Sequence, residues 1–98
     1  MKINLSEFSP VISSKEDGEE IFNRLKKALD SDDLIEIDFD KIKTMATFCA
    51  KQIFGSLYIK LGADVFFRRI HFINVSDDVK VIIQSGIQNA IEEINKAN

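Results

Sequence analysis

The sequence predicts a small α/β domain, in which helices cover mainly one face of a mixed sheet of three to four strands. Segments with the period-two alternation of strands follow segments with helical periodicity along most of the chain. One of these strand segments alternates apolar with polar residues, which indicates a sheet with one face in the core and one outside it. A chain of 98 residues is close to the usual size of one domain, so residues 1–98 are expected to share one core.

The first part of the chain predicts two strands and a helix. Lys2 to Ser6 alternates polar and apolar residues, as a strand covered on one face does. Pro10 then interrupts the pattern, so Val11 to Ser13 is expected to be a short antiparallel edge strand beside the first. A helix follows to about Leu29, with Ser14 or Asp17 as its N-cap.

Leu34 to Phe39 is the most informative strand segment. Ile35, Ile37 and Phe39 fall on one face, whereas Glu36 falls on the other with Leu34 and Asp38. We therefore expect the three apolar side chains to lie under the helices and Glu36 to face the less covered side. Strands that alternate with helices are usually parallel and joined by right-handed crossovers.

The second half of the chain predicts two more helices and one more strand. After a loop at 40–46, Thr47 is expected to cap a helix that reaches Leu61 and stops at Gly62. Arg68 to Val75 follows as a strand. Ser76 then caps a last helix with a regular apolar stripe, and we expect Ile87 and Ile91 of that stripe to lie deep in the core.

Charge and composition argue against several classes of function. A net charge of -3 lacks the basic excess of a nucleic-acid binder, and no apolar run approaches the length of a membrane span. The single Cys49 cannot form an internal disulfide, and the first residues do not have the pattern of a secretory signal, so a cytoplasmic protein is expected. Neither a glycine-rich phosphate loop nor a metal-ligand cluster is present, so no cofactor or metal is expected.

The segment from Ile37 to Gly55 resembles the STAS family of anti-sigma factor antagonists, and most closely its branch of STAS-like domains of unknown function. In that family an acidic-plus-apolar pair ends a strand, an apolar residue follows three or four positions later, and Ser or Thr opens a helix. Here the corresponding residues are Asp38-Phe39, Ile42 and Thr47-Phe48. Ala46 stands where the family usually has Asp.

The resemblance implies a bacterial, non-enzymatic regulatory module that binds another protein. Its implied partner is a GHKL-type ATPase kinase or a sigma-factor regulator, and Thr47 falls on the position of the phosphoacceptor. Docking through the second helix and the loop before it would use Asp38, Asp40, Ala46, Thr47, Phe48 and Lys51.

Two other classes of function stay open. A small enzyme would use Cys49, placed where a helix N-terminus lowers a thiol pKa, or the Asp38 carboxylate. A lone cysteine near a helix start is more typical of packing, and Asp38 with Asp40 is more typical of a solvated strand end. The other alternative is a structural homo-oligomer, such as a homodimer, because the second helix carries more apolar residues than one face needs.

Overall fold

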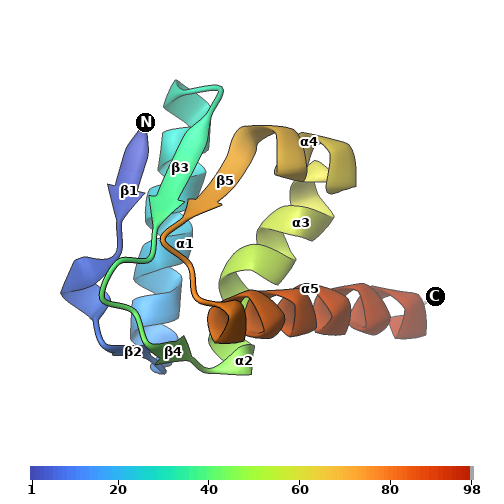
Figure 1. Ribbon diagram of the computed structural model, residues 1–98. Helices are drawn as coiled ribbons and strands as arrows, with labels where there is room; N and C mark the ends of the chain where they lie inside the picture. The colour runs from blue at the N-terminus through green and yellow to red at the C-terminus, as the bar shows by residue number, and fades with distance from the viewer. Residues whose placement is uncertain (98) are drawn as a thin grey trace.

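A three-stranded parallel sheet forms the centre of the protein, of which a computed structural model describes residues 1–97 (Figure 1). The strands lie in the order β1-β3-β5 and span Lys2–Asn4 (β1), Ile35–Asp38 (β3) and Ile70–Ile73 (β5). Ile3 lies beside Ile37, and Ile37 beside Phe72, so apolar side chains form a row across the sheet. The parallel arrangement confirms what the alternation of strands and helices predicted.

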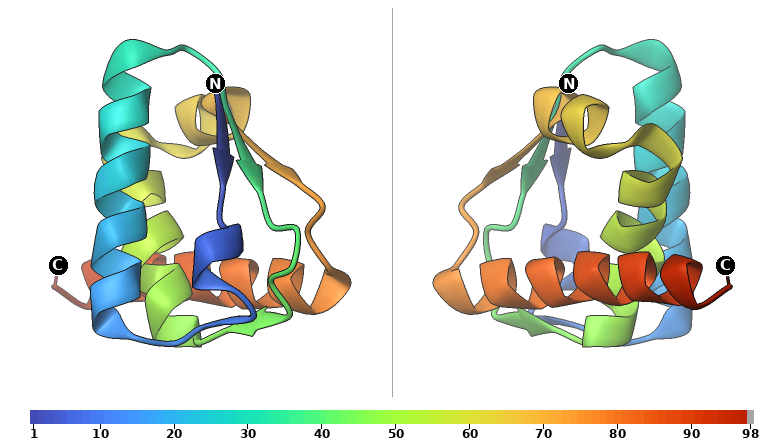
Figure 2. Two further views of the ribbon diagram at one scale, coloured as in Figure 1. Left: turned by 90° about the vertical axis from the view of Figure 1, so that its left-hand side faces the viewer. Right: turned by 90° about the vertical axis from the view of Figure 1, so that its right-hand side faces the viewer.

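Helices cover one face of this sheet and leave the other open, as predicted. Figure 2 shows α1 (Lys15–Ser31) and α3 (Ser56–Leu61) on the same side of the strands. On that side Ile35, Ile37 and Phe39 are at most 1% exposed. The side chain of Glu36 points to the open side and is half-buried, so the predicted strand register is confirmed.

Val11 and Ile12 form a short strand outside the central sheet. This strand, β2 (Val11–Ile12), pairs in parallel with β4 (Thr44–Met45) as a separate ribbon. The predicted antiparallel strand beside β1 is therefore wrong, and the sheet is parallel rather than mixed. The reason is that the 3-10 helix η1 (Ser6–Phe8) turns the chain away from β1, after which the Ile12 carbonyl accepts the N–H of Ala46 at 2.8 Å.

The predicted helix from Thr47 to Leu61 is present, but its middle is wider than an α-helix. It consists of α2 (Thr47–Ala50), a π-helical segment η2 (Lys51–Gly55) and α3 (Ser56–Leu61). Gly62 ends it with a φ of 86°, a backbone conformation that favours glycine. The stop signal in the sequence was therefore correct.

A short helix that the sequence did not predict follows Gly62. This helix, α4 (Ala63–Arg69), moves the start of the next strand from the predicted Arg68 to Ile70. Its last residue holds two elements together, because the Arg69 guanidinium donates to the carbonyls of Leu29 at 2.6 Å and Asp32 at 2.9 Å. These carbonyls belong to the last turn of α1 and to its C-cap residue, where the helix itself supplies no donors.

The last helix, α5 (Asp77–Ala97), crosses below the strands and packs on the π-helical segment (Figure 1). Ser76 accepts the N–H of Val79 at 3.2 Å, which confirms it as the cap. At the crossing a Cβ on Gly86 would lie 2.6 Å from backbone atoms of Ala50 and Lys51. The backbones of the two helices thus meet directly.

This crossing also decides which side chains of α5 enter the core. The buried positions are Val79, Ile83, Gly86 and Ala90. Ile87 and Ile91 lie on the flank of the helix and are only half-buried, so the prediction that they lie deep in the core is wrong. The close approach at Gly86 fixes the rotation of α5, and a stripe of larger side chains could not face α2 at this distance.

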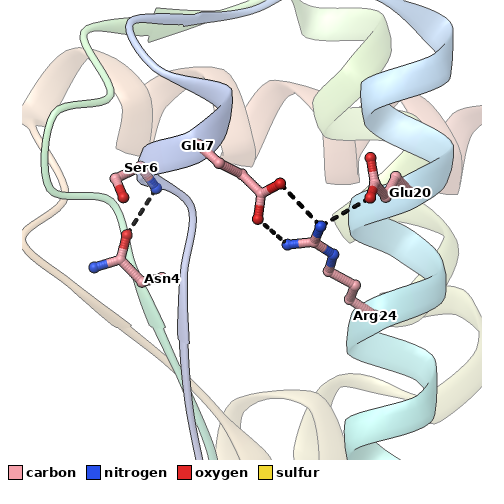
Figure 3. A network of polar contacts seen from close by, with 5 residues as sticks. All are labelled: Asn4, Ser6, Glu7, Glu20 and Arg24. Atoms are coloured by element: carbon pink, nitrogen blue, oxygen red, sulfur yellow. Dashed lines mark hydrogen bonds and ion pairs between the residues drawn. The ribbon is translucent and has the colours of Figure 1, made fainter.

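Hydrogen bonds from Arg24 hold the 3-10 helix η1 against α1 (Figure 3). The Arg24 guanidinium donates to both carboxylate oxygens of Glu7, at 2.5 and 3.0 Å, and to Glu20 at 2.8 Å. It also lies 5.0 Å from the ring centroid of Phe8, within the range of a cation–π contact. Bidentate pairing with Arg24 holds the pKa of Glu7 below its ordinary value.

Candidate functional site

The start of α2 presents the residues to which the sequence assigned function. Thr47 is the first residue of the helix, and its side chain is exposed, as predicted. Ala46 occupies the N-cap position, where its carbonyl accepts the N–H groups of Cys49 and Ala50 at 3.0 and 3.1 Å. The prediction that the Thr47 hydroxyl caps the helix is therefore wrong, because the helical hydrogen bonds begin one residue earlier.

Because Ala46 is the N-cap, the Thr47 hydroxyl is not needed to stabilise the start of the helix. Among residues 1–97 no side-chain hydrogen bond caps α2, and none of the hydrogen bonds found involves the Thr47 hydroxyl. The backbone before it is nevertheless fixed, since Ala46 bonds to β2. The hydroxyl is thus presented to solvent from a firmly held position.

Phe48 adds an exposed aromatic ring beside Thr47. Its side chain is 53% exposed, whereas the next two residues of the helix are buried. Val11, 43% exposed on β2, lies in the ribbon that leads into α2. Val11 is not among the residues predicted from the sequence to bind a partner, although its alternation with the buried Ile12 indicated that it faces outward. Contiguous patches of exposed apolar side chains typically mark a partner surface, and Phe48 contributes a large exposed ring to this end of the molecule.

We call Ala46, Thr47, Phe48 and Lys51 the α2 surface. Ala46 and Lys51 are half-buried, and Lys51 forms an ion pair with Glu93 of α5. The Lys51 charge is therefore already paired within the chain. The α2 surface is a small, partly apolar area around an exposed hydroxyl rather than a charged pocket.

Asp38 and Asp40 lie at the end of β3, and the structure does not bring Asp38 into an exposed surface. Figure 1 shows β4 between the end of β3 and the start of α2. Asp38 is only 4% exposed, while Asp40 is exposed. Asp38 accepts hydrogen bonds from the Asn74 amide and the Asp40 N–H, both at 2.9 Å, so it organises the ends of β3 and β5.

Acid should weaken the fold through Asp38. The hydrogen bonds from Asn74 and Asp40, with Lys2 at 3.4 Å, hold the pKa of Asp38 below its ordinary 3.8. A lowered folded-state pKa contributes stability above the ordinary value, and that stability is lost as the pH falls through the folded-state value. Urea unfolding at pH values from about 6 to about 3 should therefore show a steeper loss for wild type than for Asp38→Asn. Parallel curves would mean that the carboxylate is not the stabilised form.

Cys49 belongs to the core rather than to a reactive site. It is 0% exposed, and its thiol donates to the carbonyl of Ser14 at 3.4 Å. Burial raises the pKa of the Cys49 thiol, with a smaller contribution from the charge of Asp17. A buried thiol with a raised pKa lacks the thiolate that nucleophilic chemistry requires.

The acidic, histidine and cysteine side chains of the described residues are too scattered to form a metal site. Among residues 1–97 no three side chains of His, Cys, Asp and Glu lie close enough together to hold a metal ion. His71 is exposed on the open face of the sheet, in one row with Lys2 and Glu36. The arrangement of described residues that best supports a function is therefore the α2 surface.

The fold and this surface define a small α/β domain with a parallel sheet, one open sheet face and an exposed helix start. The chain belongs to the STAS-like domain of unknown function family (DUF4325), whose family model matches residues 17–80. Comparison with curated proteins and with solved structures gives no significant match. In the described residues, no helix has the length and apolar character needed to cross a membrane.

Proposed function

We propose that this STAS-like domain is a non-enzymatic regulatory module that binds a partner protein through the α2 surface. The observation that carries the proposal is the exposed Thr47 hydroxyl, without a structural role, next to the exposed ring of Phe48. An aromatic ring can provide much of the binding energy of a small interface. A neighbouring hydroxyl gives a place at which that interface can be controlled.

The proposed control is phosphorylation of Thr47 by a GHKL-type ATPase kinase, as the family resemblance implies. A phosphate would bring about -1.5 to -2 charges to the α2 surface. A partner that packs on Phe48 would then have to desolvate this charge, and an acidic partner would also be repelled. Phosphorylation is therefore expected to release the partner.

The fold itself should tolerate the modification. Thr47 is the first residue of a helix that continues through η2 and α3, so the phosphate would lie at the positive end of the helix dipole. No internal hydrogen bond of the hydroxyl would be lost. The switch would thus act on docking and leave folding unchanged.

Substitution of Thr47 tests the switch. Thr47→Asp should weaken binding to the cognate kinase or regulator by roughly tenfold or more, while Thr47→Ala should bind as wild type does. Both variants should unfold within about 0.5 kcal/mol of wild type, because Thr47 is not the cap. Calorimetric titration measures the binding, and mass spectrometry after incubation with the kinase and ATP measures phosphate on Thr47.

Thr44→Asp is the matched control, because Thr44 is an exposed threonine on β4, three residues before Thr47. It should leave binding unchanged if the effect of Asp at position 47 is specific. Equal binding by Thr47→Asp and wild type, together with no incorporation of phosphate, would contradict the switch. Phe48→Ala should weaken binding whether or not Thr47 is phosphorylated. This variant therefore tests docking separately from its regulation by phosphorylation.

A further inference from the structure

An apolar groove lies on a different part of the molecule from the α2 surface, between β5, α4 and α5. Its volume is about 310 Å³, and its lining includes Phe67, Phe72, Val75, Ile83 and Ile87. Phe67 projects from α4 at its border and is 58% exposed. Edge-to-face contacts with Phe66 at 5.2 Å and Tyr58 at 6.0 Å hold this ring in place. A groove and a firmly held projecting ring therefore occur on one surface.

The groove runs beside an unpaired sheet edge. β5 is the last strand of the sheet and pairs only with β3 in the described structure. The Ile73 carbonyl accepts the N–H of Phe39 at 3.0 Å and so points toward β3. Successive residues of a strand point their backbone groups in alternate directions, so the N–H and C=O of Phe72 point outward. This edge is ready to pair with another strand.

The opposite edge of the sheet is protected against such pairing. The outward backbone groups of β1 belong to Lys2 and Asn4, whose side chains are exposed. A lysine on an edge strand discourages pairing with another chain. β5 lacks this protection and has the apolar groove beside it, so β5 is the edge of the two that suits an interface.

We propose that a second copy of this chain docks on this edge, with the two β5 strands antiparallel about a two-fold axis at Phe72. Each Phe67 ring would then enter the groove of the other copy. An isologous interface requires that one surface be complementary to itself, and a groove with a projecting ring at its border meets that requirement. The proposal does not depend on the function proposed for the α2 surface.

Charge complementarity supports a second copy as the occupant. α4 precedes β5 and α5 follows it, so antiparallel pairing brings the end of α4 from one copy to the start of α5 in the other. The end of α4 carries the exposed Arg68, and α5 starts with the exposed Asp77 and Asp78. In the same way Asp64 of α4 would approach Lys80, which is part of the groove lining and lies 3.9 Å from the Asp77 carboxylate of its own chain.

Across this surface Arg68 and Lys80 offset two of the three carboxylates of Asp64, Asp77 and Asp78, which leaves a charge of -1, whereas the whole chain carries a net charge of -3. The net repulsion between two acidic copies would be offset here by opposite charges that face each other. An unrelated acidic or basic peptide would meet like as well as opposite charges here. Because each copy carries both signs on this surface, a two-fold rotation can place the basic residues of one copy opposite the acidic residues of the other.

Sedimentation equilibrium over a concentration series up to about 1 mM tests the proposal. The wild-type chain should change from its monomer mass of 11.1 kDa to twice that value as concentration rises. Phe67→Glu should weaken the dimer by at least about tenfold, and circular dichroism should confirm that the variant is folded. Phe48→Glu is the matched control, because it replaces another exposed aromatic ring, on the α2 surface, with a carboxylate. It should leave the dimer intact.

A charge exchange tests the antiparallel arrangement without touching the aromatic residues. Arg68→Glu should weaken the dimer. Adding Asp78→Arg to the same chain should restore it, because the acidic and basic members of the pair have then exchanged places. A chain that stays monomeric throughout the series would overturn the proposal, as would a dimer that Phe67→Glu leaves unchanged. Failure of the double variant to recover the dimer would overturn the antiparallel geometry.

Discussion

Phe54→Ala is expected to destabilise the protein by about 3–5 kcal/mol, since it removes a fully buried aromatic side chain. Phe54 lies in the π-helical segment and is 0% exposed. Its ring meets that of Phe72 edge-on at 5.3 Å and that of Phe39 at 6.1 Å, so it joins the helical layer to β5 and to the residue that follows β3. Small domains are stable by only about 5–15 kcal/mol, so the variant should unfold at a much lower urea concentration.

Phe48→Ala is the matched control for this effect. It makes the same substitution six positions earlier along the same continuous helix, where the ring is 53% exposed. Its free energy of unfolding should change by no more than about 0.5 kcal/mol. Equal destabilisation by the two variants would contradict the assignment of Phe54 to the core and of Phe48 to a docking surface.

Where one local pattern determined the structure, the sequence was sufficient to predict it. The alternation from Leu34 to Phe39 gave the correct faces of β3, since reversing it would bury Glu36 without a partner. Ser76 was correctly predicted as a helix cap, and of the two candidates Ser14 and Asp17 the structure selects Ser14, because each serine accepts an N–H three residues later. These features depend on neighbours within one turn or one strand.

Long-range contacts were the part that the sequence could not supply. β2 pairs with β4 across a wide separation in the chain, and no alternation in a two-residue strand identifies that partner. The end of α4 is held by bonds from Arg69 to carbonyls of α1, which no local pattern records. A basic residue near the end of an apolar segment is typical of a helix C-terminus. This pattern does not show whether the basic side chain also contacts another helix.

The candidate site was predicted in part for the same reason. Exposure of Thr47 at a helix start followed from local sequence, but the identity of the cap did not, because the bond from Ala46 to β2 fixes where the helix begins. The family resemblance placed Asp38 on a partner surface, and its position at a strand end indicated exposure to solvent. The Asn74 amide that donates a hydrogen bond to it is distant in sequence and adjacent only after β5 has paired with β3.

The second large effect is expected from Gly86→Ala, which should destabilise the protein by about 3 kcal/mol. Helix propensity alone predicts the opposite sign, since Ala is favoured over Gly inside a helix by about 1 kcal/mol. At this site, however, a new Cβ would lie 2.6 Å from Ala50 and Lys51 backbone atoms, which cannot move aside as a flexible side chain could. The helices would have to separate, and α5 would lose packing against α2 and η2.

Asn89→Ala on the exposed side of α5 provides the control for propensity and should stabilise the protein by a few tenths of a kcal/mol. Adding Ala50→Gly to Gly86→Ala should recover only part of the loss. The Ala50 Cβ accounts for one of the short contacts, at 2.7 Å, but the backbone contacts remain. Urea unfolding of the three variants measures these differences. A stabilising Gly86→Ala would mean that α5 and α2 are not in backbone contact, and the rotation of α5 that places Ile87 on the groove would then have to be revised.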